Sequence, residues 1–103
     1  MYIIINRCYG GFQLSDEFCE KYNRSHYLNL DERTNIEIIK EICEFGFDNA
    51  SGGFSKIRVA KISDDVTDYD ISDYDGVESV ISVVDGKISY EFKIIENEQD
   101  VII

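Results

Sequence analysis

Hydrophobic and polar positions divide the first half of the chain into a strand followed by two helices. Residues 2–8 are apolar on both faces for much of their length, which is typical of a buried strand. Ser15, followed by two acidic residues, predicts the start of a short helix that continues to about Tyr22. Thr34-Asn-Ile-Glu37 has the spacing of a capping box and predicts a second helix, with a wide apolar face, that ends at about Phe45.

The second half of the chain has the pattern of strands. Residues 56–62 predict a strand with Ile57 and Val59 on one face, and the acidic segment 63–76 contains an extended piece at 69–72. Asp85-Gly86 is a hairpin signal between the runs 79–84 and 87–95. Apolar and polar residues alternate in the second run, so we expect one buried face there, made of Ile88, Tyr90, Phe92 and Ile94.

This order of elements predicts the fold class. We expect one α+β domain over residues 1–103, with a mainly antiparallel sheet, two helices and a C-terminal β-hairpin. A hydrophobic content of 44% is enough for one core, and 103 residues leave no room for a second. The three cysteines are odd in number and lack metal-ligand spacing, which favours reduced thiols in the cytoplasm and no cofactor.

Charge changes the functional picture more than composition does. The chain carries 21 acidic and 10 basic residues, a net charge of −11. Contacts with phosphate groups need clustered Lys and Arg, so we expect no direct binding to nucleic acid and none to an anionic membrane. No segment approaches the roughly 20 apolar residues of a membrane span.

The opening motif predicts a ligand cradle where the first strand breaks. Asn and Arg at the end of a buried strand are costly without a partner, and the glycines let a ligand approach the backbone. In this hypothesis the few basic side chains converge on the phosphates of a nucleotide-like ligand. An amide forms a hydrogen bond with the edge of the nucleobase or ribose, and an aromatic ring stacks on the ligand. The alternative is a tight turn with ordinary ion pairs. The cradle would comprise Asn6, Arg7, Tyr9, Gly10, Gly11, Phe12, Arg33, Lys56 and Arg58.

A second candidate is the acidic segment. Seven acids lie between Asp64 and Glu78, and no base lies between Lys61 and Lys87. Side chains on one face of an extended strand repeat every 6–7 Å, so spaced carboxylates can imitate the phosphates of nucleic acid and bind a basic protein. The alternative is a solvated acidic loop. The candidate interaction residues are Asp68, Asp70, Asp73 and Asp75.

Two minor features leave further alternatives open. Cys8 and His26 could form the thiolate–imidazole pair of a hydrolase, although a lone His in a polar loop is usually a surface residue and a lone Cys after a strand usually packs in the core. The apolar tail Val101-Ile102-Ile103 is expected to dock on its own sheet or on another subunit, which would make a homo-oligomer.

The opening motif also carries a resemblance. Residues 6–12, Asn-Arg-Cys-Tyr-Gly-Gly-Phe, resemble the start of a widespread family of small uncharacterised bacteriophage proteins. The likeness covers most of residues 1–78, but Ser63 stands where the family usually has proline, and the C-terminal hairpin differs from the family's basic-aromatic ending. It resumes at Arg33-Thr34 and continues through Ala50-Ser51-Gly52, residues 54–59, Ile62, Asp64-Asp65-Val66, Ile71, Tyr74-Asp75-Gly76 and Glu78.

The resemblance implies a viral accessory protein in the host cytoplasm, a class in which small inhibitors and decoys are common. Combined with the cradle, it predicts a non-enzymatic counter-defence protein that sequesters a small nucleotide-like signal molecule. Combined with the acidic segment, it predicts instead a DNA mimic or anti-CRISPR-type inhibitor whose partner is a basic host defence protein. A hydrolase that uses Cys8 is the third hypothesis.

Overall fold

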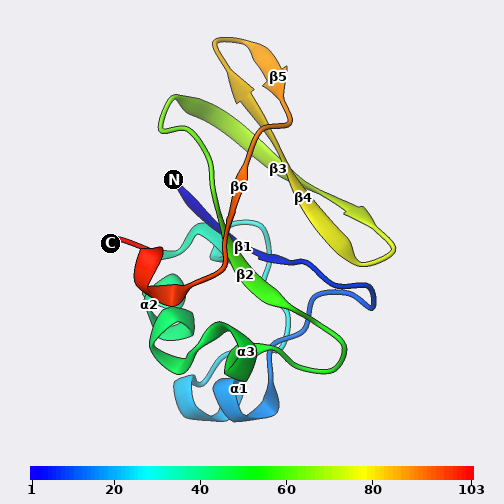
Figure 1. Cartoon of the computed structure of the whole chain (residues 1–103), viewed down its shortest axis with the longest axis vertical. Coiled ribbons are helices and arrows are strands. Elements are labelled where there is room, and N and C mark those ends of the chain that lie inside the picture. The colour runs from blue at the N-terminus through cyan, green and yellow to red at the C-terminus, as the bar shows by residue number, and fades with distance from the viewer.

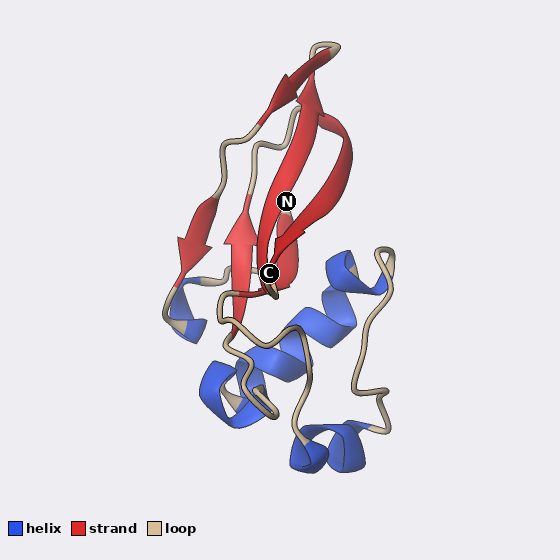
Figure 2. Ribbon diagram, turned by 90° about the vertical axis from the view of Figure 1, so that its right-hand side faces the viewer, coloured by secondary structure: helices blue, strands red, loops and turns tan.

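A computed structural model, which describes residues 1–103, has three layers: helices, an inner sheet and an outer sheet (Figures 1 and 2). The predicted α+β fold with antiparallel strands is confirmed. None of the helices has the length and apolar character needed to cross a membrane. The elements are β1 (Tyr2–Asn6), α1 (Asp16–Tyr22), the 3₁₀ turn η1 (Glu32–Thr34), α2 (Ile36–Phe45), α3 (Phe47–Ala50), β2 (Ile57–Lys61), β3 (Val66–Tyr74), β4 (Val77–Val84), β5 (Lys87–Ser89), β6 (Lys93–Ile95) and the 3₁₀ turn η2 (Glu98–Asp100).

The inner sheet has the strand order β1-β2-β6 and is covered on both faces. Ile4 packs in the core shared with the helices, whereas Ile3 and Ile5 pack in a smaller core shared with the outer sheet. Alternate side chains of a strand point to opposite faces, so a strand in a middle layer needs apolar residues at every position. This requirement explains the unbroken isoleucine run. Ile57 and Val59 share the helix-facing side, as the alternation predicted.

The helices begin at capping residues, one predicted and one not. Ser15 caps α1, and its hydroxyl accepts the Phe18 N–H at 3.2 Å. The prediction that Thr34 caps the second helix is wrong: Thr34 belongs to η1, and its hydroxyl donates to the Asp31 carbonyl. Asn35 takes the cap position instead, because its side-chain oxygen is free to accept the N–H of the third helical residue.

The outer sheet has the order β3-β4-β5 and projects away from the helices (Figure 1). Its two hairpin turns are both Asp-Gly: φ is 51° and 91° at Asp75-Gly76, and 52° and 74° at Asp85-Gly86. Two consecutive positive φ values match the twist of a tight hairpin, and Asp-Gly tolerates them. In the acidic segment 63–76 the extended part is thus longer than the predicted 69–72, because the nine residues Val66–Tyr74 form an edge strand.

The single strand expected at 87–95 is divided between the two sheets. β5 pairs with β4 in the outer sheet, and β6 pairs with β2 in the inner sheet. The expectation of one buried face is therefore wrong for Ile88 and Tyr90, which are exposed. The chain leaves the outer sheet after Ser89 and crosses to the inner sheet. There β6 pairs with β2, and this pairing buries Ile95 in the core shared with the helices.

Candidate functional site

Asn6, predicted to bind a ligand, is completely buried and uses its amide within the chain. Its Nδ2 donates to the carbonyls of Cys8 and Gly76 at 2.7 and 2.6 Å. Its Oδ1 accepts the Lys56 N–H at 2.7 Å. The end of β1 did need polar partners, but those partners are the backbone of the β3–β4 turn and of the segment before β2. Asn6 therefore joins three parts of the fold.

Arg33 and Phe12 are also parts of this internal joint. The Arg33 guanidinium forms a two-pronged ion pair with the Glu78 carboxylate, with N–O distances of 2.8 and 3.1 Å, and both side chains are buried. One Glu78 oxygen also accepts the Asn6 N–H at 2.7 Å. The guanidinium carbon of Arg33 lies 3.8 Å from the centre of the buried Phe12 ring. Buried charges are retained only when paired and bonded, and this pair meets both conditions.

The other predicted bases are bonded within the chain or point elsewhere. Arg7 donates to the Glu78 carbonyl at 2.6 Å, and its guanidinium lies over the Phe92 ring. Arg58 is buried and pairs with Asp48 and Glu96 at 3.0 and 3.2 Å, beside α3. The Lys56 side chain is exposed and forms no ion pair. None of the nine predicted cradle residues lines a cavity of the structure.

The glycines of the opening motif make a close backbone contact with the β3–β4 turn. The Gly10 N–H donates to the Asp75 carbonyl at 3.3 Å. A Cβ atom at Gly76 would lie 2.3 Å from the Gly11 nitrogen, so that no other residue fits there without movement. The glycines thus let two loops touch, where the sequence suggested that they admit a ligand.

We call residues 9–11, 53–55 and 74–76 the tip, because these three loops lie side by side (Figure 1). Each of the loops presents one large aromatic side chain to solvent. Tyr9 is 65% exposed, Phe54 is 83% exposed and Tyr74 is 75% exposed. Aromatic side chains exposed to this extent lose most of the burial that normally stabilises them, so a cluster of three on one side of the molecule indicates a contact surface.

The four predicted interaction residues are all exposed and lie on β3 and its turn. Tyr69 and Ile71 pack against the inner sheet, so the alternation places Asp68 and Asp70 on the opposite, outward face. On that face Asp68 stands opposite Val83 and Asp70 opposite Ile81 in the neighbouring strand. Asp73 and Asp75 flank Tyr74 at the tip. The hairpin therefore combines carboxylates with solvent-accessible apolar side chains.

The same carboxylates protect the free edge of β3. The Tyr69 N–H donates to Asp68 at 2.9 Å, and the Ile71 N–H donates to Asp70 at 2.8 Å. These N–H groups are two residues apart and point to one side, and β3 pairs only with β4. An edge whose donors are bonded to its own acids does not recruit another strand. Contacts by this strand must therefore use side chains.

Sequence reasoning missed Glu78, which organises the joint. In the sequence it is the last acid of the acidic segment and one of the residues that carry the resemblance, with no structural role predicted for it. The signal was its position in β4. Side chains of this strand alternate between the two faces, and Glu78 lies on the same face as the buried Val80. An acid at an inward position of a strand requires a buried base, and Arg33 is that base.

The structure does not bring Cys8 and His26 together. The His26 Nε2 lies 2.7 Å from an Asp16 carboxylate oxygen at the start of α1. No hydrogen bond joins the ring to Cys8, so no thiolate–imidazole pair is formed. Nor does any group of three or more His, Cys, Asp or Glu side chains have an arrangement that could hold a metal ion.

We expect Cys43 and Cys19 to react slowly with iodoacetamide near neutral pH. Burial raises the pKa of the Cys43 thiol to about 11, and Glu98 adds to the shift. Burial, followed by the charge of Asp16, also raises the pKa of Cys19. The thiolate is the nucleophile, so both cysteines are protonated and inert at about pH 8. Mass spectrometry of each cysteine after timed alkylation checks this, and alkylation of Cys43 as fast as in urea would contradict it.

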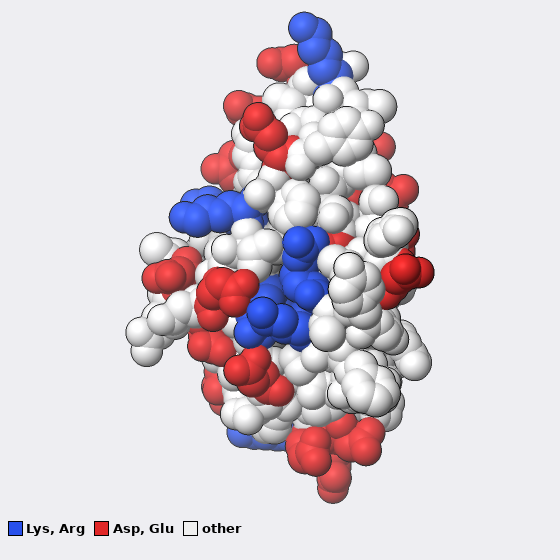
Figure 3. All heavy atoms as spheres, turned by 45° about the vertical axis from the view of Figure 1, so that its right-hand side comes forward, with Lys and Arg blue, Asp and Glu red and all other residues white.

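Acidic side chains are spread over the face shown in Figure 3, and basic ones gather near its centre. Three arginines are paired with carboxylates, whereas the lysines take part in no ion pair. Comparison of the chain with protein-family models, with curated proteins and with solved structures returned no match.

Proposed function

We propose that this chain is a non-enzymatic interaction protein that binds a basic partner protein through the β3–β4 hairpin. The opening motif suggests a bacteriophage accessory protein, so the partner we propose is a host defence protein in the cytoplasm of the infected cell. The bound surface of that partner is its nucleic-acid site, because that site presents the positive charge that the hairpin complements.

The observation that carries the proposal is the exposure of four carboxylates on one projecting hairpin. Asp68 and Asp70 face outward on the strand, and Asp73 and Asp75 lie at its end. None of the four forms an ion pair within the chain. Against a net charge of −11, these unpaired acids favour encounter with a positively charged surface and disfavour nucleic acid itself.

Apolar groups on the same hairpin supply the second requirement of a stable interface. Ile81 and Val83 lie half-buried on the outward face beside the acids, and Ile88 continues the apolar row on β5. Tyr74 extends the surface to the tip. Protein interfaces combine a desolvated apolar or aromatic centre with a charged rim, and this face offers both.

The first hypothesis from the sequence, sequestration of a small nucleotide-like signal, draws little support from the residues chosen for it. Asn6, Arg33 and Arg58 are buried and bonded to groups of the same chain. Releasing Asn6 and Arg33 to a ligand would break the joint that holds the two sheets, and releasing Arg58 would break its ion pairs with Asp48 and Glu96. The expected homo-oligomer stays a prediction: Ile102 and Ile103 are exposed beside an apolar cavity of about 360 Å³.

The proposal predicts inhibition of a nuclease that depends on the hairpin acids. We expect the protein to inhibit at least one of three enzymes: a CRISPR nuclease, a restriction endonuclease and a non-specific bacterial nuclease, each cleaving a labelled DNA duplex. Inhibition should weaken as salt is raised. The variant in which Asp68, Asp70, Asp73 and Asp75 are all changed to Asn should inhibit at least about tenfold less well.

The matched control removes four charges elsewhere. Glu17, Glu20, Glu37 and Glu44 are exposed on the helices, and changing them to Gln makes the net charge less negative by the same amount. This variant should inhibit as well as the unmodified protein. Equal loss in both variants would mean that only net charge matters, and absence of inhibition for all three enzymes would overturn the proposal.

A further inference from the structure

Ser82 breaks the hydrophobic pattern of β4 in a way that the fold does not explain. The inward positions of this strand are Glu78, Val80, Ser82 and Val84. Glu78 is bonded to Arg33, and Val80 packs in the core. Ser82 is only 2% exposed, yet its hydroxyl forms no hydrogen bond within the chain. The oxygen is not sealed from solvent, because the only completely buried side-chain oxygen or nitrogen without a partner is the Tyr22 hydroxyl, so the Ser82 hydroxyl is available to a molecule from outside.

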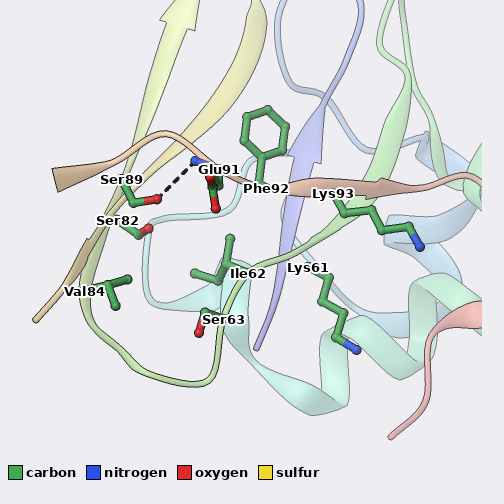
Figure 4. A pocket seen from close by; sticks show the side chains of 9 residues that line it. All are labelled: Lys61, Ile62, Ser63, Ser82, Val84, Ser89, Glu91, Phe92 and Lys93. Atoms are coloured by element: carbon green, nitrogen blue, oxygen red, sulfur yellow. Dashed lines mark hydrogen bonds between the residues drawn. The ribbon is translucent and has the colours of Figure 1, made fainter.

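The Ser82 hydroxyl opens into a cavity of about 540 Å³ between the two sheets (Figure 4). The cavity lies where the sheets diverge, beneath the segment that crosses from β5 to β6. Ser89 stands beside Ser82 on the neighbouring strand, Ser63 lies across the cavity from them, and Ile62, Val84 and Phe92 contribute apolar groups to the wall. Small-molecule sites have this size and combine an apolar lining with a few convergent polar groups.

The serine hydroxyls can donate hydrogen bonds to a guest molecule. The Ser63 oxygen accepts the Asp65 N–H at 3.2 Å, and the Ser89 oxygen accepts the Glu91 N–H at 3.3 Å. Each oxygen is thereby fixed in place, while its O–H remains available. Ser82 can both donate and accept. The cavity therefore presents three positioned hydroxyls without a competing partner inside the chain.

The charges around the cavity do not favour an anion as the group bound at the serines. Lys61 and Lys93 line one side, but their ammonium groups point away from the serines (Figure 4). The carboxylate nearest to the hydroxyls is that of Glu91. A guest that fits this point donates to a carboxylate, accepts from hydroxyls and turns an apolar face toward Ile62 and Val84.

We propose that this cavity binds a sugar ring. A sugar carries hydroxyls that both donate and accept, and its C–H face can pack on the apolar side chains of Ile62 and Val84. The ring can be part of a nucleoside, whose base would occupy the remaining volume, or of a free saccharide. The proposal concerns a site separate from the β3–β4 hairpin face and does not depend on the proposed protein partner.

The experiment is a titration of the ¹⁵N-labelled full chain, followed by amide chemical shifts, with adenosine, ribose, glucose and inorganic phosphate as separate probes. Shifts with adenosine alone would assign the site to nucleosides, and shifts with ribose or glucose would assign it to saccharides. Both results support a sugar site. The proposal would be overturned if the Ser63, Ser82 and Ser89 signals shifted with phosphate alone. It would also be overturned if none of the four probes shifted them.

Ser82→Val separates binding from folding. Valine fills space and removes the unpartnered hydroxyl, so the melting temperature should rise while binding weakens by at least about tenfold. Ser72→Val makes the same change on the outward face of β3 and should leave binding unchanged. Should Ser82→Val fold poorly, Ser82→Ala provides the same binding test without added bulk. Unchanged affinity in the Ser82 variants would overturn the proposal.

Discussion

Glu78→Ala should lower the free energy of unfolding by about 3–5 kcal/mol, because it leaves the Arg33 guanidinium buried without its carboxylate. The Asn6 N–H loses its acceptor in the same step. Domains of this size have a total stability of roughly 5–15 kcal/mol, so the variant should be close to unfolding at room temperature. Urea unfolding followed by circular dichroism measures the change. Where Glu78→Ala does not fold, Glu78→Gln retains an acceptor and should be intermediate.

The Arg24–Glu41 pair is the internal comparison for this prediction. It has similar N–O distances, 2.7 and 2.8 Å, but joins α1's C-terminal end to α2 in a partly exposed position. Solvent weakens the attraction there and can hydrate the remaining charge. Glu41→Ala should therefore cost only about 0.5–1 kcal/mol. Equal losses for the two glutamates would show that burial of the Arg33–Glu78 pair contributes nothing beyond an ordinary surface pair.

Local signals in the sequence were sufficient for β1, β2 and the main helices. The isoleucine run of β1 has no polar alternation because helices cover one face and the outer sheet covers the other. Ser15 and Asp85-Gly86 were recognisable because a cap and a tight turn depend on their own few residues. The second Asp-Gly turn, at residues 75–76, carried the same signal and was obscured by the acids around it.

Long-range pairing was beyond the sequence pattern. Residues 87–95 alternate like one strand, and nothing local indicates that β6 leaves the hairpin to complete the inner sheet. The cost of ending a buried strand with Asn6 correctly indicated that it needs polar partners. The sequence alone could not distinguish a ligand from Gly76, a partner 70 positions away in the same chain. For that reason the candidate site is the β3–β4 hairpin and no longer the cradle at the opening motif.

Gly76→Ala should destabilise the protein and loosen the tip at the same time. The alanine would adopt a φ of 91°, which costs about 1 kcal/mol, and its Cβ would meet the Gly11 backbone at 2.3 Å. Backbone cannot rotate away as a side chain does, so the contact should add about 1–3 kcal/mol. Urea unfolding measures the sum. Faster hydrogen exchange of the Gly10 N–H, which donates to the Asp75 carbonyl, would locate the damage at the tip.

Gly86→Ala isolates the contribution of that contact. Gly86 occupies the same position in the other Asp-Gly turn, with a φ of 74°, but a Cβ there would meet no atom within 4 Å. Both variants bear the cost of an alanine at positive φ. They differ because only a Cβ at position 76 would clash with the backbone of the opening motif. Gly86→Ala should therefore cost about 1 kcal/mol, keep the Gly10 N–H protected and inhibit nucleases normally. If Gly76→Ala behaves in the same way, the opening glycines are not needed to hold the hairpin, and their close contact with the β3–β4 turn does not position the acidic surface.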